Sequence, residues 1–451
     1  MDDNTTLPTA VAVAPPPKRF NVYKVQPFDL WNYLFTQVHS PQLIRWQGAF
    51  ADHLDLAALG QAIEASYKAM PLITARFLSN GLWPRWRPRP VALEEVLHVV
   101  DRPADPVAAI RDAMAVTLDF AGGPQLRVTV VRQDDHDTIC VVVNHMLCDG
   151  TGFRDYLIEL SRLYTQTEAG ETPTPRPPLP RGVGPVVARF SRLEHLTLLR
   201  GRAEAFSREA IDAAGAVSFE RPDGPDRYLT RLVPEPVFTK ARQAAKAHGA
   251  TVNDLALASL SRAWCHLTGV ERMALPSTFD LRSFLPPGEQ AALAHLATNC
   301  LIAVTVPPDA PMAHTLTQVH DQMTVHKSGA SVLRSALAWP LATTTCPWPI
   351  LKRNYGRFLT LPGVSFSNLG VIDPKEVSFA NHVMTAAHFS TAVKPVPFMQ
   401  LVISSLRGDL TLSFNLRGDD EAVAFAERMF DAIAGEMADF GASHAPAAET
   451  A

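Results

Sequence analysis

The sequence predicts a mixed α/β protein built as two layered α/β sandwiches. The chain has 451 residues, too many for one ordinary core, since domains commonly contain about 100–200 residues. Helical and strand-like hydrophobic patterns alternate in both halves of the chain, as expected for layered sheets and helices. Between the halves, residues 171–188 contain six prolines, a composition typical of a linker.

The proline-rich segment sets the predicted domain boundary, near residue 180. Residues 20–180 then form the first lobe and residues 189–440 the second. Residues 1–19 are small, polar and proline-rich, so we expect them to be disordered. Residues 441–451 are alanine-rich and are expected to form a flexible tail.

The first half shows both hydrophobic periodicities. Residues 54–69 carry apolar groups at helical spacing, and Met70-Pro71 ends that pattern because proline disfavours helical geometry in the residue before it. Residues 72–77 alternate like a strand. Residues 125–132 and 137–143 are typical of a β-hairpin joined by a polar turn, and the second of these strands is almost entirely apolar, as expected when both faces are covered. A helix with one apolar face follows Asp149.

The second half repeats the alternation. The predicted helices and strands are, in order, a helix over residues 234–248, a helix over 254–268, strands over 273–281 and 300–306, a helix over 312–327, a hairpin over 401–406 and 410–416, and a helix over 421–440. Gly249 closes the first of these helices, and residues 251–254 resemble a capping box that opens the second.

Composition and charge exclude several classes of function. Hydrophobic residues make up 47% and charged residues 19%, which is ordinary for a globular protein. The net charge of −4, with lysine and arginine scattered, lacks the basic surface that nucleic-acid binding needs. No apolar run is long enough to span a membrane, and the N-terminus lacks the basic region of a signal peptide. Five cysteines without a Cys-x-x-Cys pair indicate free thiols, so we expect a cytoplasmic protein.

No metal site is predicted. His295, His320 and His326 lack ligand spacing, and the acidic residues 134–137 lie in a tight polar turn, where a structural role is favoured. His382 and His388 lie near the segment 365–370; a role in lining a pocket stays open for them, although a structural role is favoured.

The residue best placed for chemistry is His145, in the hexapeptide His-Met-Leu-Cys-Asp-Gly. It lies where an apolar strand ends and a helix begins, so rigid secondary structure positions its side chain. An imidazole is the side chain best suited to remove a proton near neutral pH. A lone histidine at a strand end is more often structural, and a bare His-x-x-x-Asp-Gly arises by chance in roughly one chain in 25 of this length. The preceding strand, the glycines Gly150 and Gly152 and the amphipathic helix that follows favour a catalytic site.

Residues 144–152, Asn-His-Met-Leu-Cys-Asp-Gly-Thr-Gly, resemble the HHxxxDG signature of the thioester-dependent acyltransferase superfamily. This superfamily includes nonribosomal peptide condensation domains, polyketide-associated acyltransferases, wax ester synthases and plant BAHD acyltransferases. Four other segments resemble condensation-like proteins in the same order along the chain, namely residues 53–77, 251–260, 279–282 and 365–370. The resemblance implies two chloramphenicol-acetyltransferase-like lobes in a V-shaped pseudo-dimer with a central tunnel.

The resemblance also implies roles for site residues. His145 would be the general base, and Asp149 would point away from substrate and pair with Arg282 to hold the loop. Gly150 would leave space for the acyl-pantetheine arm, with its N–H as one candidate donor to the oxyanion. Other candidates for binding substrate or the oxyanion are Asn144, Ser365, Ser367 and Asn368.

The implied reaction moves an acyl group from a thioester to an alcohol or amine in natural-product or lipid biosynthesis. The thioester would be acyl-coenzyme A or an acyl or peptidyl phosphopantetheinyl carrier protein that acts in trans, since the sequence shows no carrier module. No bound cofactor and a monomer are expected. Asn144 departs from the signature, whose first position is histidine, and the plant BAHD motif Asp-Phe-Gly-Trp-Gly is absent. Two alternatives stay open: a non-catalytic protein that docks a carrier protein, and an enzyme that epimerises or cyclises a tethered intermediate.

Overall fold

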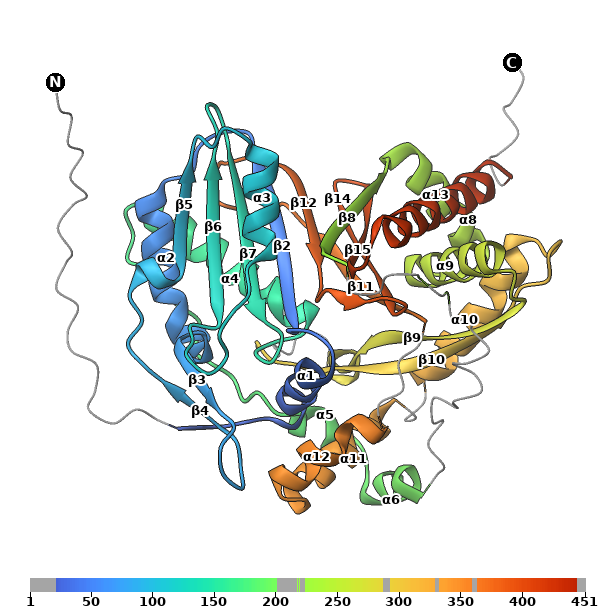
Figure 1. Ribbon diagram of the computed structural model, residues 1–451, viewed down its shortest axis with the longest axis horizontal. Coiled ribbons are helices and arrows are strands. Elements are labelled where there is room, and N and C mark those ends of the chain that lie inside the picture. The colour runs from blue at the N-terminus through green and yellow to red at the C-terminus, as the bar shows by residue number, and fades with distance from the viewer. Residues whose placement is uncertain are drawn as a thin grey trace.

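The structure is a computed structural model that describes residues 22–200, 217, 219, 224–286, 293–328, 332–358 and 363–443. In this part of the chain, two main β-sheets are each covered by helices, and a small third sheet lies below the first in the view of Figure 1. The mixed α/β class predicted from the sequence is confirmed.

The first sheet has five strands, and its two central neighbours, β2 and β7, run antiparallel. In spatial order the strands are β12 (Met384–Ser390), β2 (Leu43–Phe50), β7 (Asp137–Asn144), β6 (Leu126–Arg132) and β5 (Leu97–Asp101). Every residue of β7 is buried, as its apolar sequence predicts for a strand covered on both faces.

Helices cover both faces of this sheet, so the side chains of β7, which alternate between the two faces, pack into two different cores. Ile139, Val141 and Val143 belong to the core that contains α2 (Leu56–Ala69) and α4 (Gly150–Glu168). Cys140 points to the opposite face and packs against α3 (Pro106–Ala115), which crosses that face in Figure 1. The end of β7 is thereby held rigidly where the His145 loop begins.

The second sheet has seven strands and carries its helices on one side in Figure 1. Its strands are β10 (Ala297–Thr305), β9 (Arg272–Asp280), β11 (Val364–Ile372), β14 (Met399–Leu406), β15 (Asp409–Arg417), β13 (Lys394–Pro395) and β8 (Asp226–Val233). Its helices are α8 (Glu235–Ala247), α9 (Val252–Thr268), α10 (Met312–Ser328) and α13 (Asp420–Ser443).

One strand crosses the predicted domain boundary. β12 comes from the second half of the chain but pairs antiparallel with β2, with Phe389 opposite Trp46. Both of these side chains are buried in the core of the first sheet. Residues of the second half therefore complete the first lobe, so the division near residue 180 does not separate two independent cores.

The remaining helices lie towards the lower end of the two main sheets in the view of Figure 1. The helices are α1 (Pro27–Val38), α5 (Gly184–Val187), α6 (Arg192–Arg200), α11 (Leu333–Thr345) and α12 (Trp348–Phe358), the small sheet is β1 (Tyr23–Lys24), β4 (Arg85–Pro88) and β3 (Ala75–Leu78), and the 3₁₀ turns are Pro71–Thr74, Leu93–Glu95 and Leu281–Phe284. Trp348 and Tyr355 of α12 bury their rings in the first core.

Several boundaries differ from the sequence prediction, among them those of β3, α9 and α13. The strand expected over residues 72–77 starts as a 3₁₀ turn, and β3 begins only at Ala75, because Pro71 favours a turn start. The capping box forms as predicted, with Thr251 and Asp254 bonding each other's backbone, but α9 begins at Val252 rather than at residue 254. The last helix extends to Ser443, so residues 441–443 are helical rather than part of a flexible tail. Residues 1–19 and 444–451 lie outside the described part.

Candidate active site

The loop of residues 145–149 joins the end of β7 to the start of α4. Asp149 is the N-cap of α4, and its Oδ1 accepts a hydrogen bond from the Gly152 backbone N–H at 2.8 Å. The backbone N–H of His145 donates to the carbonyl of Gln42 at 3.0 Å, which ties the loop to the segment before β2. The loop is therefore fixed at both ends.

The contacts of the His145 ring define its tautomer. Its Nδ1 lies 2.9 Å from the backbone carbonyl oxygen of Cys148, which can only accept a hydrogen bond. Asn32 Nδ2 lies farther from Nδ1, at 3.4 Å, and donates instead to the His145 carbonyl at 3.0 Å. The shorter contact therefore assigns the proton to Nδ1. The Nε2 atom has no hydrogen-bond partner among the described residues. Burial lowers the pKa of His145 below its usual value of 6.5, which favours the neutral ring with a free lone pair on Nε2.

A cavity of about 730 Å³ adjoins His145 and is lined by residues of both halves of the chain. A second cavity of about 710 Å³ is lined by α4, the proline-rich segment and Arg282. Thr151 and Asp280 line both cavities, and the Thr151 hydroxyl donates to Asp280 Oδ2 at 2.9 Å. The two cavities therefore share these two lining residues, and a continuous central tunnel stays a prediction.

The structure places Arg282 against Asp149, as the resemblance implied. Arg282 Nη1 lies 2.8 Å from Asp149 Oδ2, and the Leu296 backbone N–H donates to the same oxygen at 2.6 Å. Burial alone would raise the pKa of Asp149, but Arg282 outweighs this effect and holds the pKa below its usual 3.8. The Asp149 side chain is only 3% exposed and faces Arg282, so it is a buried anchor of the loop.

A second arginine, Arg181, holds the loop from the other side, and it was not among the residues predicted from the sequence. Its guanidinium donates two hydrogen bonds of 3.0 Å to Asp29 and two more to the carbonyls of Met146 and Leu147 at 3.1 and 2.7 Å. Asp29 is fully buried in α1. No local pattern in the proline-rich segment signals this contact, because it depends on a partner 152 residues away.

The space at Gly150 is occupied by protein. A Cβ built at this position would lie 1.9 Å from Leu369 Cδ2, so a larger residue would require the Leu369 side chain to shift. The glycine thus makes room for Leu369, and the expectation that it also leaves room for an acyl-pantetheine arm stays a prediction. Gly150 still lines the cavity beside His145.

Asn144 does not line either cavity. Its side chain is fully buried, donates to Gln125 Oε1 at 2.7 Å and accepts from the Met146 backbone N–H at 3.0 Å. Both ends of the amide therefore shape the turn after β7. The expectation that Asn144 binds substrate or the oxyanion is corrected to this structural contact.

The three candidates on β11 all line the cavity. Ser367 Oγ lies 3.1 Å from Thr278 Oγ1, and Asn368 contacts Asn253 at 3.4 Å. The Ser365 hydroxyl is buried and has no hydrogen-bond partner in the described part of the chain. A buried hydroxyl without a partner is costly unless a ligand satisfies it, so Ser365 is the best available donor of the three.

His295 is a further site residue, which the sequence indicated only as a rejected metal ligand. Its ring centroid lies 5.1 Å from that of His145, and its other neighbour, Phe28, stacks at 5.4 Å. Burial and the neighbouring His145 lower the pKa of His295 to about 3, so it stays neutral. Its Nδ1 atom is buried without a partner among the described residues. The site therefore contains two adjacent neutral imidazoles.

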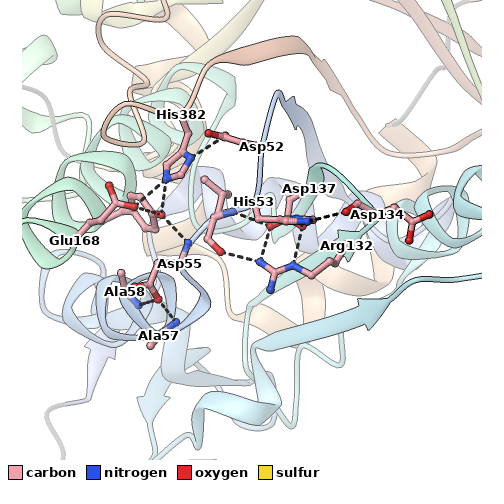
Figure 2. Close-up of polar contacts among 12 residues, drawn as sticks. Asp52, His53, Asp55, Ala57, Ala58, Arg132, Asp134, Asp137, Glu168 and His382 are labelled. Carbon is pink, nitrogen blue, oxygen red and sulfur yellow. Dashed lines mark hydrogen bonds and ion pairs between the residues drawn. The ribbon is translucent and has the colours of Figure 1, made fainter.

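Two other histidines lie away from both cavities. His382 bridges Asp52 and Glu168, each at 2.8 Å, beside the first turn of α2 and the end of α4 (Figure 2). His388 lies on β12 and lines neither cavity. Neither histidine lines the two cavities described above, so a structural role stays favoured for both.

The acidic turn after β6 is organised by ion pairs. Asp137 binds Arg132 at 2.8 Å and His53 at 3.0 Å, and Figure 2 shows these side chains converging on its carboxylate. Within the described ranges no three His, Cys, Asp or Glu side chains come together as a metal site would require, and none of the described helices has the length and hydropathy to cross a bilayer.

Comparison with known proteins identifies the fold. The structure of polyketide synthase associated protein 5 from Mycobacterium tuberculosis superimposes with a TM-score of 0.66, at 14% identity over 90% of this chain and 96% of that one. The epimerization domain from the third module of tyrocidine synthetase B gives a TM-score of 0.65, at 14% identity over 94% of this chain and 98% of that one. The first condensation domain of the calcium-dependent antibiotic synthetase gives a TM-score of 0.65, at 16% identity over 93% of this chain and 97% of that one. The chain therefore has the two-lobed fold of condensation domains and polyketide-associated acyltransferases, as predicted.

Sequence comparison is more limited. No family model matches the chain. One of the proteins that make up the linear gramicidin synthase of Brevibacillus parabrevis is 30% identical over 131 residues, which are 27% of this chain and 2% of that protein. An uncharacterized protein of Mycobacterium tuberculosis is 27% identical over 221 residues, which are 48% of this chain and 51% of that protein. The matched region thus spans about half or less of these relatives.

Proposed function

We propose that this protein is an acyltransferase that moves an acyl group from a thioester to an alcohol or amine. The observation that carries the proposal is the His145 ring, whose Nδ1–H is held by the Cys148 carbonyl while Nε2 is free beside a cavity of about 730 Å³. An imidazole fixed in this tautomer is an effective general base. The fold shared with condensation domains and acyltransferases supports the same reaction class by analogy.

In the proposed reaction, His145 Nε2 takes the proton of the acceptor hydroxyl or amine as that atom attacks the thioester carbonyl. The carbonyl oxygen gains negative charge, and the Ser365 hydroxyl, which lacks a partner in the described part of the protein, donates to it. The C–S bond then breaks, and the leaving thiolate takes the proton from His145. Coenzyme A or a phosphopantetheinyl carrier protein in trans supplies the thioester, and the two adjoining cavities give donor and acceptor separate approaches.

The test is a panel of acyl thioesters and alcohol or amine acceptors, with product mass as the readout. His145→Ala is expected to lower kcat by about 10²–10⁴-fold, the usual contribution of a general base. His388→Ala is the matched control, since this half-buried histidine lines neither cavity. Equal turnover by His145→Ala would overturn the base assignment. Absence of product with every pair, together with retained binding of a carrier protein, would favour a docking role.

A further inference from the structure

Lys394 is a buried cation in the wall of the cavity that holds His145. It lies in β13 at the start of the segment that follows the crossing strand β12, and it is only 5% exposed. Its side chain lines the cavity together with His145 and Gln42. The proposed acyl transfer gives this lysine no role.

The polar contacts of Lys394 leave most of its hydrogen-bonding capacity unused. Its Nζ donates to Gln42 Oε1 at 3.1 Å, the one side-chain hydrogen bond that it makes within the described part of the chain. The ammonium also lies over two aromatic rings, 4.9 Å from the centroid of Phe35 and 5.6 Å from that of Phe398. An ammonium has three donors, so two of them have no hydrogen-bond partner among the described residues.

No carboxylate in the described ranges balances this charge. Among these residues, no Asp or Glu lies within ion-pair distance of Lys394. A second buried cation, Arg45, acts on Lys394 electrostatically, and its guanidinium is bound to the backbone carbonyls of Met114 and Thr391. Burial, and then Arg45, lower the pKa of Lys394 to about 7. A buried ammonium without a counter-ion is unfavourable, so the side chain is partly neutral near pH 7, and a bound carboxylate would favour its charged form.

Gln42 connects Lys394 to the proposed base. Its backbone carbonyl accepts from the His145 N–H at 3.0 Å, and its side-chain carbonyl accepts from Lys394 Nζ. A ligand group bound to Lys394 would therefore occupy the same cavity as the acceptor or the acyl chain that reacts beside His145.

We propose that Lys394 is the counter-ion for a carboxylate of the substrate, so that the protein acts on an acidic acyl group or an acidic acceptor. This inference rests on the proposed acyl transfer and specifies its substrate class. A single ammonium between two aromatic rings matches a monoanion. A phosphate dianion generally needs several backbone N–H groups or arginine forks, and the guanidinium of Arg45 is already committed to carbonyls.

Two matched comparisons separate the possible positions of the carboxylate. In the first, glutaryl and pentanoyl thioesters are compared with one neutral acceptor. In the second, an amino acid and its amide are compared as acceptors with one neutral acyl donor. The wild-type protein is expected to prefer the acidic member of one pair by at least about tenfold in kcat/KM, because that carboxylate meets an otherwise unpaired charge.

Lys394→Met removes the charge while keeping a long apolar side chain, and Lys394→Gln also keeps a donor toward Gln42. Both variants are expected to lose the preference while they keep turnover of the neutral member, and either serves if the other fails to fold. Equal loss on acidic and neutral substrates, or no wild-type preference in either comparison, would overturn the inference.

Direct binding makes the test independent of turnover. Monomethyl glutarate and N-acetylglycine are expected to raise the melting temperature of the wild-type protein, while dimethyl glutarate and N-acetylglycine methyl ester are expected to cause no shift, and the Lys394 variants none with any of these compounds. A shift without any acyl transfer would leave the carboxylate site standing and remove the proposed reaction. Transfer of neutral acyl groups without a melting-temperature shift or a preference for acidic substrates would leave the proposed reaction standing and remove the carboxylate site.

Discussion

His145 Nδ1 lies 2.9 Å from the carbonyl oxygen of Cys148, three residues further along the same loop. This contact assigns the proton of the neutral ring to Nδ1 and leaves Nε2 as the basic atom. The loop that makes the contact is held from two sides, by Arg282 through Asp149 and by Arg181 through backbone carbonyls. The geometry of the base thus depends on two arginines that are more than 100 residues apart in sequence.

The first prediction concerns the pH dependence of turnover. A general base must be deprotonated to act, so kcat/KM falls as the pH drops through its pKa. Because burial lowers the pKa of His145 below 6.5, the plateau of kcat/KM is expected to extend below pH 6.5. The profile is measured with neutral substrates, so that binding of a carboxylate beside Lys394 does not add to it. A midpoint of the acidic limb above 6.5 would contradict the assignment.

The second prediction concerns the Arg282–Asp149 ion pair. Arg282→Ala leaves Asp149 buried without its partner, so the free energy of unfolding is expected to fall by about 3–5 kcal/mol, together with activity. The control is Asp420→Ala, which removes an exposed pair with Arg227 and is expected to cost at most about 1 kcal/mol. Urea unfolding measures both. Lost activity at unchanged stability in Arg282→Ala would contradict an anchoring role.

The sequence predicted features that local patterns determine. The apolar face of α4, the capping box of α9 and the hairpin around Arg407-Gly-Asp409 all follow from residues close to one another in the chain. The position of His145 followed in the same way, because it depends on one strand end and one helix start. Its partner Arg282 came from the family resemblance.

The features that the sequence did not predict depend on contacts between distant segments. β12 pairs with β2 across more than 300 residues, and no local pattern in either strand specifies that partner. Arg181, His295 and Lys394 look ordinary in their local sequence. They gain significance only because the fold buries them beside the His145 loop or in its cavity.

The third prediction tests the close approach at Gly150. Gly150→Ala introduces a Cβ that collides with Leu369 Cδ2, so the variant is expected to lose about 1–3 kcal/mol of stability and part of its activity. Leu369→Ala removes the colliding atom, so the double variant is expected to be more stable than the two single effects predict. Thermal unfolding of the four proteins gives the coupling. Strict additivity would show that Gly150 is needed for another reason.

The fourth prediction compares two serines of β11. Ser365 Oγ has no partner among the described residues, whereas Ser367 is bound to Thr278. Ser365→Ala is therefore expected to lower kcat by about 10²–10³-fold with little change in KM, as for loss of an oxyanion donor. Ser367→Ala is expected to change kcat far less. Similar effects of the two substitutions would rule out a specific role for Ser365.

The fifth prediction concerns His382, which ties the segment before β12 to the turn between β2 and α2 and to the end of α4 (Figure 2). Burial alone lowers its pKa, but hydrogen bonds to Glu168 and Asp52 outweigh this effect and hold the pKa above 6.5. Protonated His382 therefore stabilises the fold fully below pH 6.5, and this contribution is lost as the pH rises through the raised value. His382→Gln is expected to lower the melting temperature more at pH 5.5 than at pH 8.5, relative to wild type at each pH. Equal losses at both values would show that the ion pairs contribute no pH-dependent stability.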